Sequence, residues 1–144
     1  MKEIRAARWT AERELEIEVF PVTGPGAGEV QVAVASVGVC GSDLHFFRGK
    51  FPPRTGIIPG HEFAGVLSAV GSGVDHLREG DVVGIEPLVY CGRCRYCQTG
   101  NYHECVSHDV IGESVDGGMT QLATVPGYTA VAAPGGVDAE LAAL

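Results

Sequence analysis

The sequence has few basic residues and no long apolar run. Ten of its 144 residues are Lys or Arg and eighteen are Asp or Glu, which gives a formal net charge of −8 at pH 7. A nucleic-acid partner is disfavoured, because neutralising phosphates requires a basic face. No apolar stretch reaches the roughly eighteen residues that a membrane-spanning helix needs. We therefore expect a soluble protein with neither a nucleic-acid partner nor a membrane partner.

Two kinds of sequence signal are also missing. Residues 1–5 lead into no apolar segment like that of a secretory signal peptide, so a cytoplasmic protein with free thiols is expected. The chain has no G-x-G-x-x-G fingerprint in a strand–helix–strand unit; residues 71–74 lack the third glycine and a following helix. Nucleotide binding is therefore not expected of this chain.

Cysteine, by contrast, is concentrated in one place. Four of the five cysteines lie within fifteen residues: Cys91, Cys94, Cys97 and Cys105. The first three are spaced three apart, so a tight loop can bring four thiolates to the corners of a tetrahedron. Soft sulfur ligands in this geometry suit Zn²⁺ or an iron–sulfur cluster.

Other interpretations of the cysteines fit less well. Disulfides need an oxidising compartment, and a thioredoxin-like redox pair needs a βαβ pattern that is absent. Bacterial ferredoxins share C-x₂-C-x₂-C, but their fourth cysteine follows after about three residues and precedes proline. Here seven residues separate Cys97 from Cys105, Val106 follows, and no second run exists. The spacing favours a closed structural zinc site in a lobe at residues 89–106.

Short strands dominate the rest of the pattern. Residues 1–9 and 13–19 read as a hairpin, in which Leu15, Ile17 and Val19 alternate with glutamates and should face a core. Residues 29–39 are apolar on both faces, which is typical of a central strand. Further strands are expected at 60–71, 81–87, 110–112, 119–125 and 130–133. Many short strands with glycine-rich corners indicate a mainly β protein, a small barrel with little helix.

Two short helices are also expected. Gly41 should end the central strand and allow a helix whose cap is Ser42 or Asp43. Asp138 is a good N-cap for residues 139–144, a run of strong helix formers that ends after six residues. That length is too short for an isolated helix, so we expect the chain to be cut inside a larger protein.

Three motifs occur in order with compatible gaps. Cys40-Gly41-Ser42-Asp43-x-His45 comes first, Gly60-His61-Glu62-x-x-Gly65 second, and the four-cysteine group third. Together they closely resemble the zinc-dependent medium-chain alcohol and polyol dehydrogenases over essentially the whole chain. The resemblance implies a GroES-like catalytic domain at residues 1–137, including the structural zinc lobe 89–106. Residues 138–144 would begin the helix that leads to an absent nucleotide-binding Rossmann domain.

The resemblance also implies roles for individual residues. Cys40 and His61 would bind the catalytic zinc, and Glu62 would be a nearby carboxylate that enters or leaves the coordination sphere. Ser42 would hold the proton of the substrate hydroxyl, and His45 would continue the relay toward solvent. The structural zinc would be held by the cysteines of the lobe, Cys91, Cys94, Cys97 and Cys105.

The implied activity belongs to the full-length protein. It would oxidise a primary or secondary alcohol, or a polyol, to a carbonyl by zinc-assisted hydride transfer to NAD or NADP. The cofactor would need the absent domain, so the isolated chain should be inactive, and the full-length protein should be a homo-oligomer. Where many polyol and threonine enzymes of the family have a glutamate, this chain has Gln121, and the family's remaining metal ligand lies beyond residue 144. The alternative is a GroES-like zinc module that acts as a scaffold without chemistry.

Overall fold

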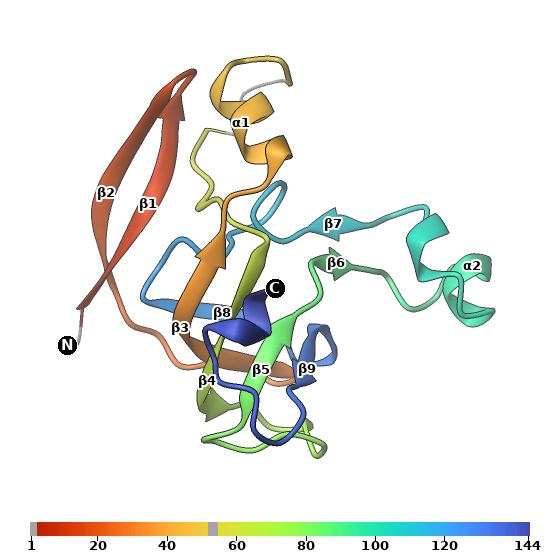
Figure 1. Cartoon of the computed structure of the whole chain (residues 1–144). Helices are drawn as coiled ribbons and strands as arrows, with labels where there is room; N and C mark the ends of the chain where they lie inside the picture. Colours follow the sequence, from red (N-terminus) through yellow and green to blue (C-terminus); the bar gives the residue numbers. More distant parts are fainter. Residues whose placement is uncertain (1–2, 52–54) are drawn as a thin grey trace.

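A five-stranded antiparallel sheet forms the body of the protein. The computed structural model describes residues 3–51 and 55–144. The strand order in the sheet is β8-β3-β4-β5-β9 (Figure 1). Its strands are β3 (Glu29–Gly38), β4 (Glu62–Val70), β5 (Val82–Ile85), β8 (Leu122–Pro126) and β9 (Ala130–Ala132). The mainly β architecture expected from the sequence is confirmed.

Smaller elements surround this sheet. A hairpin of β1 (Glu3–Ala11) and β2 (Glu14–Pro21) stands on one side, and a ladder of β6 (Leu88–Val89) and β7 (Asp109–Val110) leads out to the cysteine lobe on the other (Figure 1). The two short α-helices are α1 (Gly41–Phe47) and α2 (Arg95–Gln98). Single 3₁₀ turns lie at Tyr102–Glu104, Gly127–Thr129 and Leu141–Ala143. No helix in the described ranges combines the length and the apolarity needed to cross a membrane.

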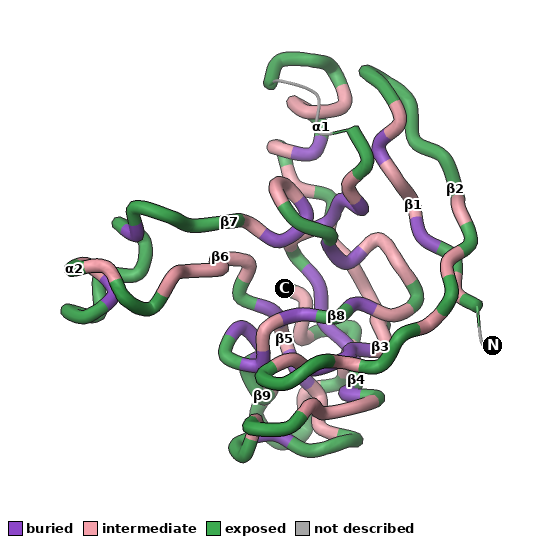
Figure 2. The backbone as a smooth tube through the Cα atoms, turned by 180° about the vertical axis from the view of Figure 1, so that it is seen from behind, coloured by how far each residue is buried: buried purple, intermediate pink, exposed green. Residues whose placement is uncertain are grey.

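The core lies along the middle strands of the sheet. Val30 and Val32 of β3, Phe63 and Leu67 of β4, and Val83 of β5 are all buried. Figure 2 shows buried stretches along the body, whereas β2 and the cysteine lobe are largely exposed. Strand β3 pairs with β8 on one side and with β4 on the other. The prediction of a central strand at residues 29–39 is therefore confirmed.

The hairpin departs from the prediction in one respect. Its apolar side chains on β2 do not face a core: Leu15, Ile17 and Val19 are 40%, 67% and 58% exposed. The reason is that β1 is the strand that joins the body, because Ala7 N–H donates to the Met119 carbonyl at 2.8 Å and the side chain of Trp9 is buried. Strand β2 is left as the outer strand (Figure 1).

One of the two predicted helices is absent, and the other differs in its N-cap residue. Residues 139–144 form only the 3₁₀ turn Leu141–Ala143, although Asp138 Oδ1 does accept the Leu141 N–H at 2.8 Å. This turn packs on β4 and β5, where a Cβ at Gly84 would lie 2.8 Å from the Ala142 carbonyl oxygen. Helix α1 begins where it was expected, but its N-cap residue is Cys40; Asp43 contributes to the cap from the first turn, where its Oδ2 accepts the Cys40 N–H at 2.8 Å. Contacts with distant strands accompany the turn at residues 141–143, whereas the cap of α1 is a local interaction between residues 40 and 43.

Candidate active site and metal centre

The first candidate site lies where β3 ends and β4 begins. Antiparallel pairing places Gly38 opposite Glu62, and Cys40 follows Gly38 at the turn into α1. Ligand atoms of Cys40, His61 and Glu62 lie within 4.8 Å of one another. A thiol, an imidazole and a carboxylate converging in this way form a donor set that suits Zn²⁺.

Polar side chains approach His61 from two sides. Ser42 Oγ lies 3.4 Å from His61 Nε2. On the other side of the ring, Asp43 Oδ1 and Glu113 Oε1 lie 3.8 Å and 4.0 Å from Nδ1. Within the described ranges, His61 Nδ1 is buried and has no hydrogen-bond partner. The ring therefore has its hydroxyl neighbour at Nε2 and its carboxylate neighbours at Nδ1.

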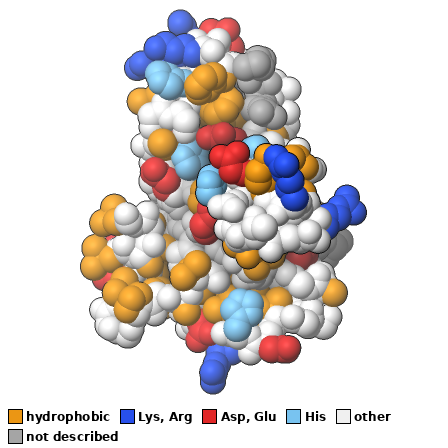
Figure 3. All heavy atoms as spheres, turned by 90° about the vertical axis from the view of Figure 1, so that its right-hand side faces the viewer, with side chains coloured by type: hydrophobic (Ala, Val, Ile, Leu, Met, Phe, Trp, Pro, Cys, Tyr) orange, Lys and Arg blue, Asp and Glu red, His pale blue; other side chains and the backbone are white. Residues whose placement is uncertain are grey.

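Beside this cluster lies a cavity of about 640 Å³. His61, Glu62 and Glu86 contribute polar groups, and much of the rest of the wall is apolar, with Val131 and Leu144 among its residues. The volume and the mixture of apolar wall and few polar groups are typical of small-molecule sites. In Figure 3, His and acidic side chains gather near the middle of the face that carries the lobe.

Two residues considered in the sequence lie outside the cluster. His45 packs edge-on against Phe51, with ring centroids 5.6 Å apart, and its Nδ1 is buried without a partner in the described part of the chain. Gln121 lies at the junction of hairpin and body, where its Oε1 accepts the Arg5 N–H at 2.9 Å. Gln121 therefore has a structural role at this junction.

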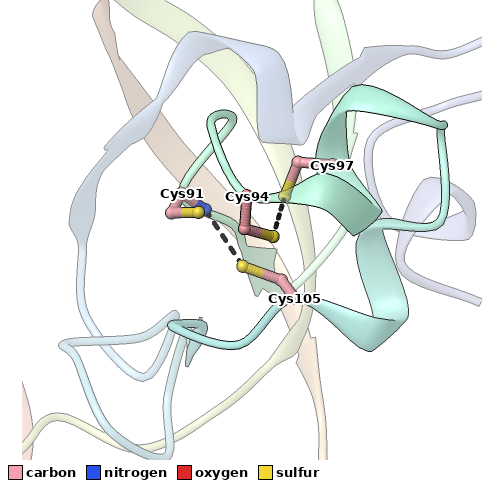
Figure 4. A group of neighbouring side chains, drawn as sticks. All are labelled: Cys91, Cys94, Cys97 and Cys105. Carbon is pink, nitrogen blue, oxygen red and sulfur yellow. Dashed lines mark hydrogen bonds between the residues drawn. The ribbon is translucent and has the colours of Figure 1, made fainter.

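The second candidate site is the cysteine lobe. All four cysteine sulfur atoms lie within 4.8 Å of one another, and Figure 4 shows the side chains converging from α2 and the loops around it. Cys94 Sγ and Cys97 Sγ are 3.5 Å apart. A tetrahedral zinc with bonds of about 2.3 Å would separate its sulfur ligands by about 3.8 Å. The four residues therefore fit a closed tetrahedral metal site, as the spacing predicted.

Electrostatics within the lobe also favour a cation. Hydrogen bonds from backbone N–H groups, first that of Cys97 and then that of Val106, lower the pKa of Cys94 to about 6. Burial raises the pKa of Cys97 to about 12. The two neighbouring thiols thus do not ionise equally, and a nearby positive charge would favour the thiolate form of both.

Three tyrosines tie the lobe to the body. The Tyr90 ring stacks on Tyr102 with centroids 4.2 Å apart and contacts Tyr128 at 4.5 Å. The Tyr128 hydroxyl also accepts the Tyr90 N–H and donates to the Tyr90 carbonyl, each at 3.2 Å. These contacts join the first residues of the lobe to the 3₁₀ turn at Gly127–Thr129.

Sequence reasoning missed two carboxylates of the first site. The sequence predicted Asp43 only as a helix cap. Its position three residues after Cys40 could also have indicated that its carboxylate lies close to that proposed ligand. Glu113 carries no sequence signal, because only the fold brings the turn after β7 against the residue before β4. Both lie beside the buried Nδ1 of His61.

Comparison with known proteins identifies the family of this chain. Residues 26–135 match the family model described as the alcohol dehydrogenase GroES-like domain. Sorbitol dehydrogenase of Bacillus subtilis (strain 168) is 41% identical over 123 residues, which are 82% of this chain and 35% of that protein.

Solved structures give the same result. The alcohol dehydrogenase rspB of E. coli CFT073, complexed with the cofactor NADH, superposes with a TM-score of 0.91 at 36% identity, over 99% of this chain and 42% of that one. A cobalt- and zinc-bound thermostable alcohol dehydrogenase from Pyrobaculum aerophilum superposes with a TM-score of 0.86 at 35% identity. The superposition covers 99% of this chain and 44% of that chain. The chain therefore spans less than half the length of these relatives.

Proposed function

The chain belongs to the family of alcohol dehydrogenase GroES-like domains, and from this premise we propose that it is the N-terminal, metal-binding catalytic domain of a zinc-dependent NAD(P) alcohol or polyol dehydrogenase. The observation that carries the proposal is the convergence of Cys40, His61 and Glu62 beside a cavity of small-molecule size. The name of the Bacillus subtilis relative, a sorbitol dehydrogenase, supports a polyol as one substrate class.

The residues of the first site divide into ligands and proton carriers. Cys40 Sγ and His61 Nε2 would hold a catalytic zinc, and Glu62 would join or leave it. When bound, the metal supplies Lewis-acid polarisation of the alcohol or carbonyl oxygen. Ser42, whose hydroxyl lies 3.4 Å from His61 Nε2, is placed to take the proton of the substrate hydroxyl. His45 would pass this proton on toward solvent.

The cysteine lobe serves stability in this proposal. Cys91, Cys94, Cys97 and Cys105 would hold a structural zinc that leaves no open coordination position. The lobe's stem consists of two strands of two residues each, β6 and β7. So short a ladder cannot by itself order the loop, and the metal would supply the missing free energy.

Cofactor and assembly concern the longer protein. We propose that residues 1–137 form the catalytic domain and that residues 138–144 lead into a nucleotide-binding domain. NAD or NADP would bind to that second domain. The superposition on an NADH complex over 42% of that chain's length supports this division. A homo-oligomer in the cytoplasm, acting on a small alcohol or polyol, completes the proposal.

The test uses the protein that carries this chain together with its nucleotide-binding domain. NAD(P)H formation is followed with sorbitol, threonine and ethanol for the wild type and for His61→Ala. We expect the variant to lose at least about 10³-fold in turnover, since several kcal/mol of charge stabilisation are removed. His76→Ala, on an exposed loop, is the matched control. Equal turnover by the wild type and His61→Ala would favour the scaffold alternative.

A further inference from the structure

The last residue pair of the β3–β4 ladder has a glycine on one strand and a carboxylate on the other. Gly38 ends β3 and lies opposite Glu62, which begins β4, and both residues line the cavity beside the first site. Glycine weakens a strand, because it costs more chain entropy and has no side chain to pack. The φ of Gly38 lies outside the left-handed region that favours glycine. Its backbone angles therefore do not require glycine, and the space beside it does.

The Glu62 carboxylate occupies the place that a side chain at position 38 would take. A Cβ at Gly38 would lie 2.7 Å from Glu62 Oε2 and 3.2 Å from Glu62 Cβ. Opposite residues of an antiparallel pair ordinarily keep their Cβ atoms about 4.5–5.5 Å apart. The Glu62 side chain therefore packs directly over the backbone of Gly38.

This position of the Glu62 side chain is the one that brings its carboxylate to the first site. A carboxylate oxygen of Glu62 lies within 4.8 Å of ligand atoms of Cys40 and His61. Cys40 and His61 are half-buried, whereas Glu62 is exposed, so solvent is open to the carboxylate on the side away from the other two donors. A methyl group at position 38 would stand on the same face of the sheet as the Glu62 side chain and would push the carboxylate outward. The empty space above Gly38 therefore keeps the three donors together.

We propose that Gly38 is a positioning residue, which through its lack of a side chain gives the Glu62 carboxylate its place beside Cys40 and His61. The effect is steric. The overlap that alanine would create is mainly with the far end of a flexible side chain, so the carboxylate moves while β3 and β4 stay paired. The inference rests on the proposed function in one respect, because it takes Glu62 as a ligand of the metal; the place of the carboxylate is tested separately.

The test compares the wild type with Gly38→Ala in the protein that carries this chain together with its nucleotide-binding domain. Crystal structures with the first site free of metal show where the Glu62 carboxylate lies. We expect Gly38→Ala to displace Oε2 by about 1 Å or more, because non-bonded atoms need about 3.5 Å, and to lower the melting temperature by less than about 4 °C. Gly24→Ala, where a Cβ would meet nothing within 4 Å, is the matched control. An unmoved carboxylate in Gly38→Ala would overturn the inference.

A second measurement uses Zn²⁺ alone. With the lobe already loaded, competition with a chelator gives the affinity of the first site, which Gly38→Ala should weaken by about 10-fold, as is typical when the support of a metal ligand is lost. Adding Gly38→Ala to Glu62→Ala should weaken it no further, because no carboxylate is left to displace. An equal loss in both backgrounds would show that the methyl group acts on something else, and would also overturn the inference. If Glu62→Ala leaves the affinity unchanged, the proposed ligand role of Glu62 fails instead, and the metal-free structures alone decide the role of Gly38.

Discussion

At the scale of single residues, Asp43 connects the start of a helix to the candidate active site. One carboxylate oxygen accepts the Cys40 N–H at 2.8 Å, which satisfies a free donor at the beginning of α1. The other lies 3.8 Å from His61 Nδ1. A single buried side chain thus holds the backbone of one proposed ligand and faces the ring of another.

Replacing Asp43 should destabilise the whole domain. Asp43→Ala leaves the Cys40 N–H without its acceptor, so we expect the free energy of unfolding to fall by about 2 kcal/mol. Urea denaturation measures the change. Asp43→Asn should cost less, because its amide oxygen can still accept. Asp75→Ala, at an exposed position, should stay within about 0.5 kcal/mol of the wild type; an equal loss in Asp75→Ala and Asp43→Ala would contradict the explanation.

At the scale of elements, the first site depends on glycines that allow backbones to touch. A Cβ at Gly117 would lie 2.2 Å from the Gly60 oxygen, and a Cβ at Gly112 would lie 2.5 Å from the same carbonyl. Gly118 N–H also donates to the Gly60 carbonyl at 2.7 Å. The turn after β7 and the segment before β8 therefore both pack directly against the backbone of Gly60, the residue before His61.

Gly73 and Gly112 have similar backbone angles, so alanine substitutions at the two positions can distinguish the cost of atomic overlap from the cost of backbone strain. Gly73 has a φ of +83° with nothing within 4 Å of a built Cβ, whereas Gly112 has a φ of +79° and overlaps Gly60. We expect Gly73→Ala to cost about 1–2 kcal/mol for the left-handed conformation alone. Gly112→Ala should cost about 3 kcal/mol or more, since the overlap adds to the strain. Thermal denaturation of both variants tests this, and equal losses would show that the contact does not matter.

The cysteine lobe should unfold separately from the sheet. Cys94→Ser removes one of four thiols that converge on a common point, so the proposed metal would be lost from the lobe. Hydrogen exchange should become fast at residues 89–106, while β3 and β4 keep their protection. Cys40→Ser, which leaves the lobe intact, is the control. Loss of protection throughout the sheet in Cys94→Ser would mean that lobe and body fold as one unit.

At the scale of the whole molecule, a cavity of about 640 Å³ lies between the first site and the last residues of the chain. Its wall includes Ala142, Ala143 and Leu144 together with His61 and Glu62. The solved relatives are more than twice as long as the region that matches. The proposed chemistry would rely on the proposed nucleotide-binding domain as well as on this cavity.

The 144-residue chain should show neither cofactor binding nor turnover. Hydride transfer needs the nicotinamide within about 3–3.5 Å of the reacting carbon. The part of the chain that the structure describes has no glycine-rich loop that leads from a strand into a helix of the nucleotide-binding kind and could hold the phosphates. NADH fluorescence titration should give no saturable binding, and NAD(P)H production from sorbitol or ethanol should equal the background. Attaching the nucleotide-binding domain should recover both. Turnover by the chain alone that His61→Ala abolishes would disprove this division of function.

The sequence by itself determined the features that depend on near neighbours. Cysteine spacing predicted the lobe, apolar residues on both faces predicted β3, and Gly41 predicted the change from strand to helix; the GroES-like fold implied by the motifs is confirmed by the family match. Only the tertiary structure decided that β2 exposes Ile17, that residues 139–144 make a single 3₁₀ turn, and that Glu113 lies beside His61. These features depend on contacts between segments far apart in the chain, and local periodicity carries no information about which face such contacts will cover.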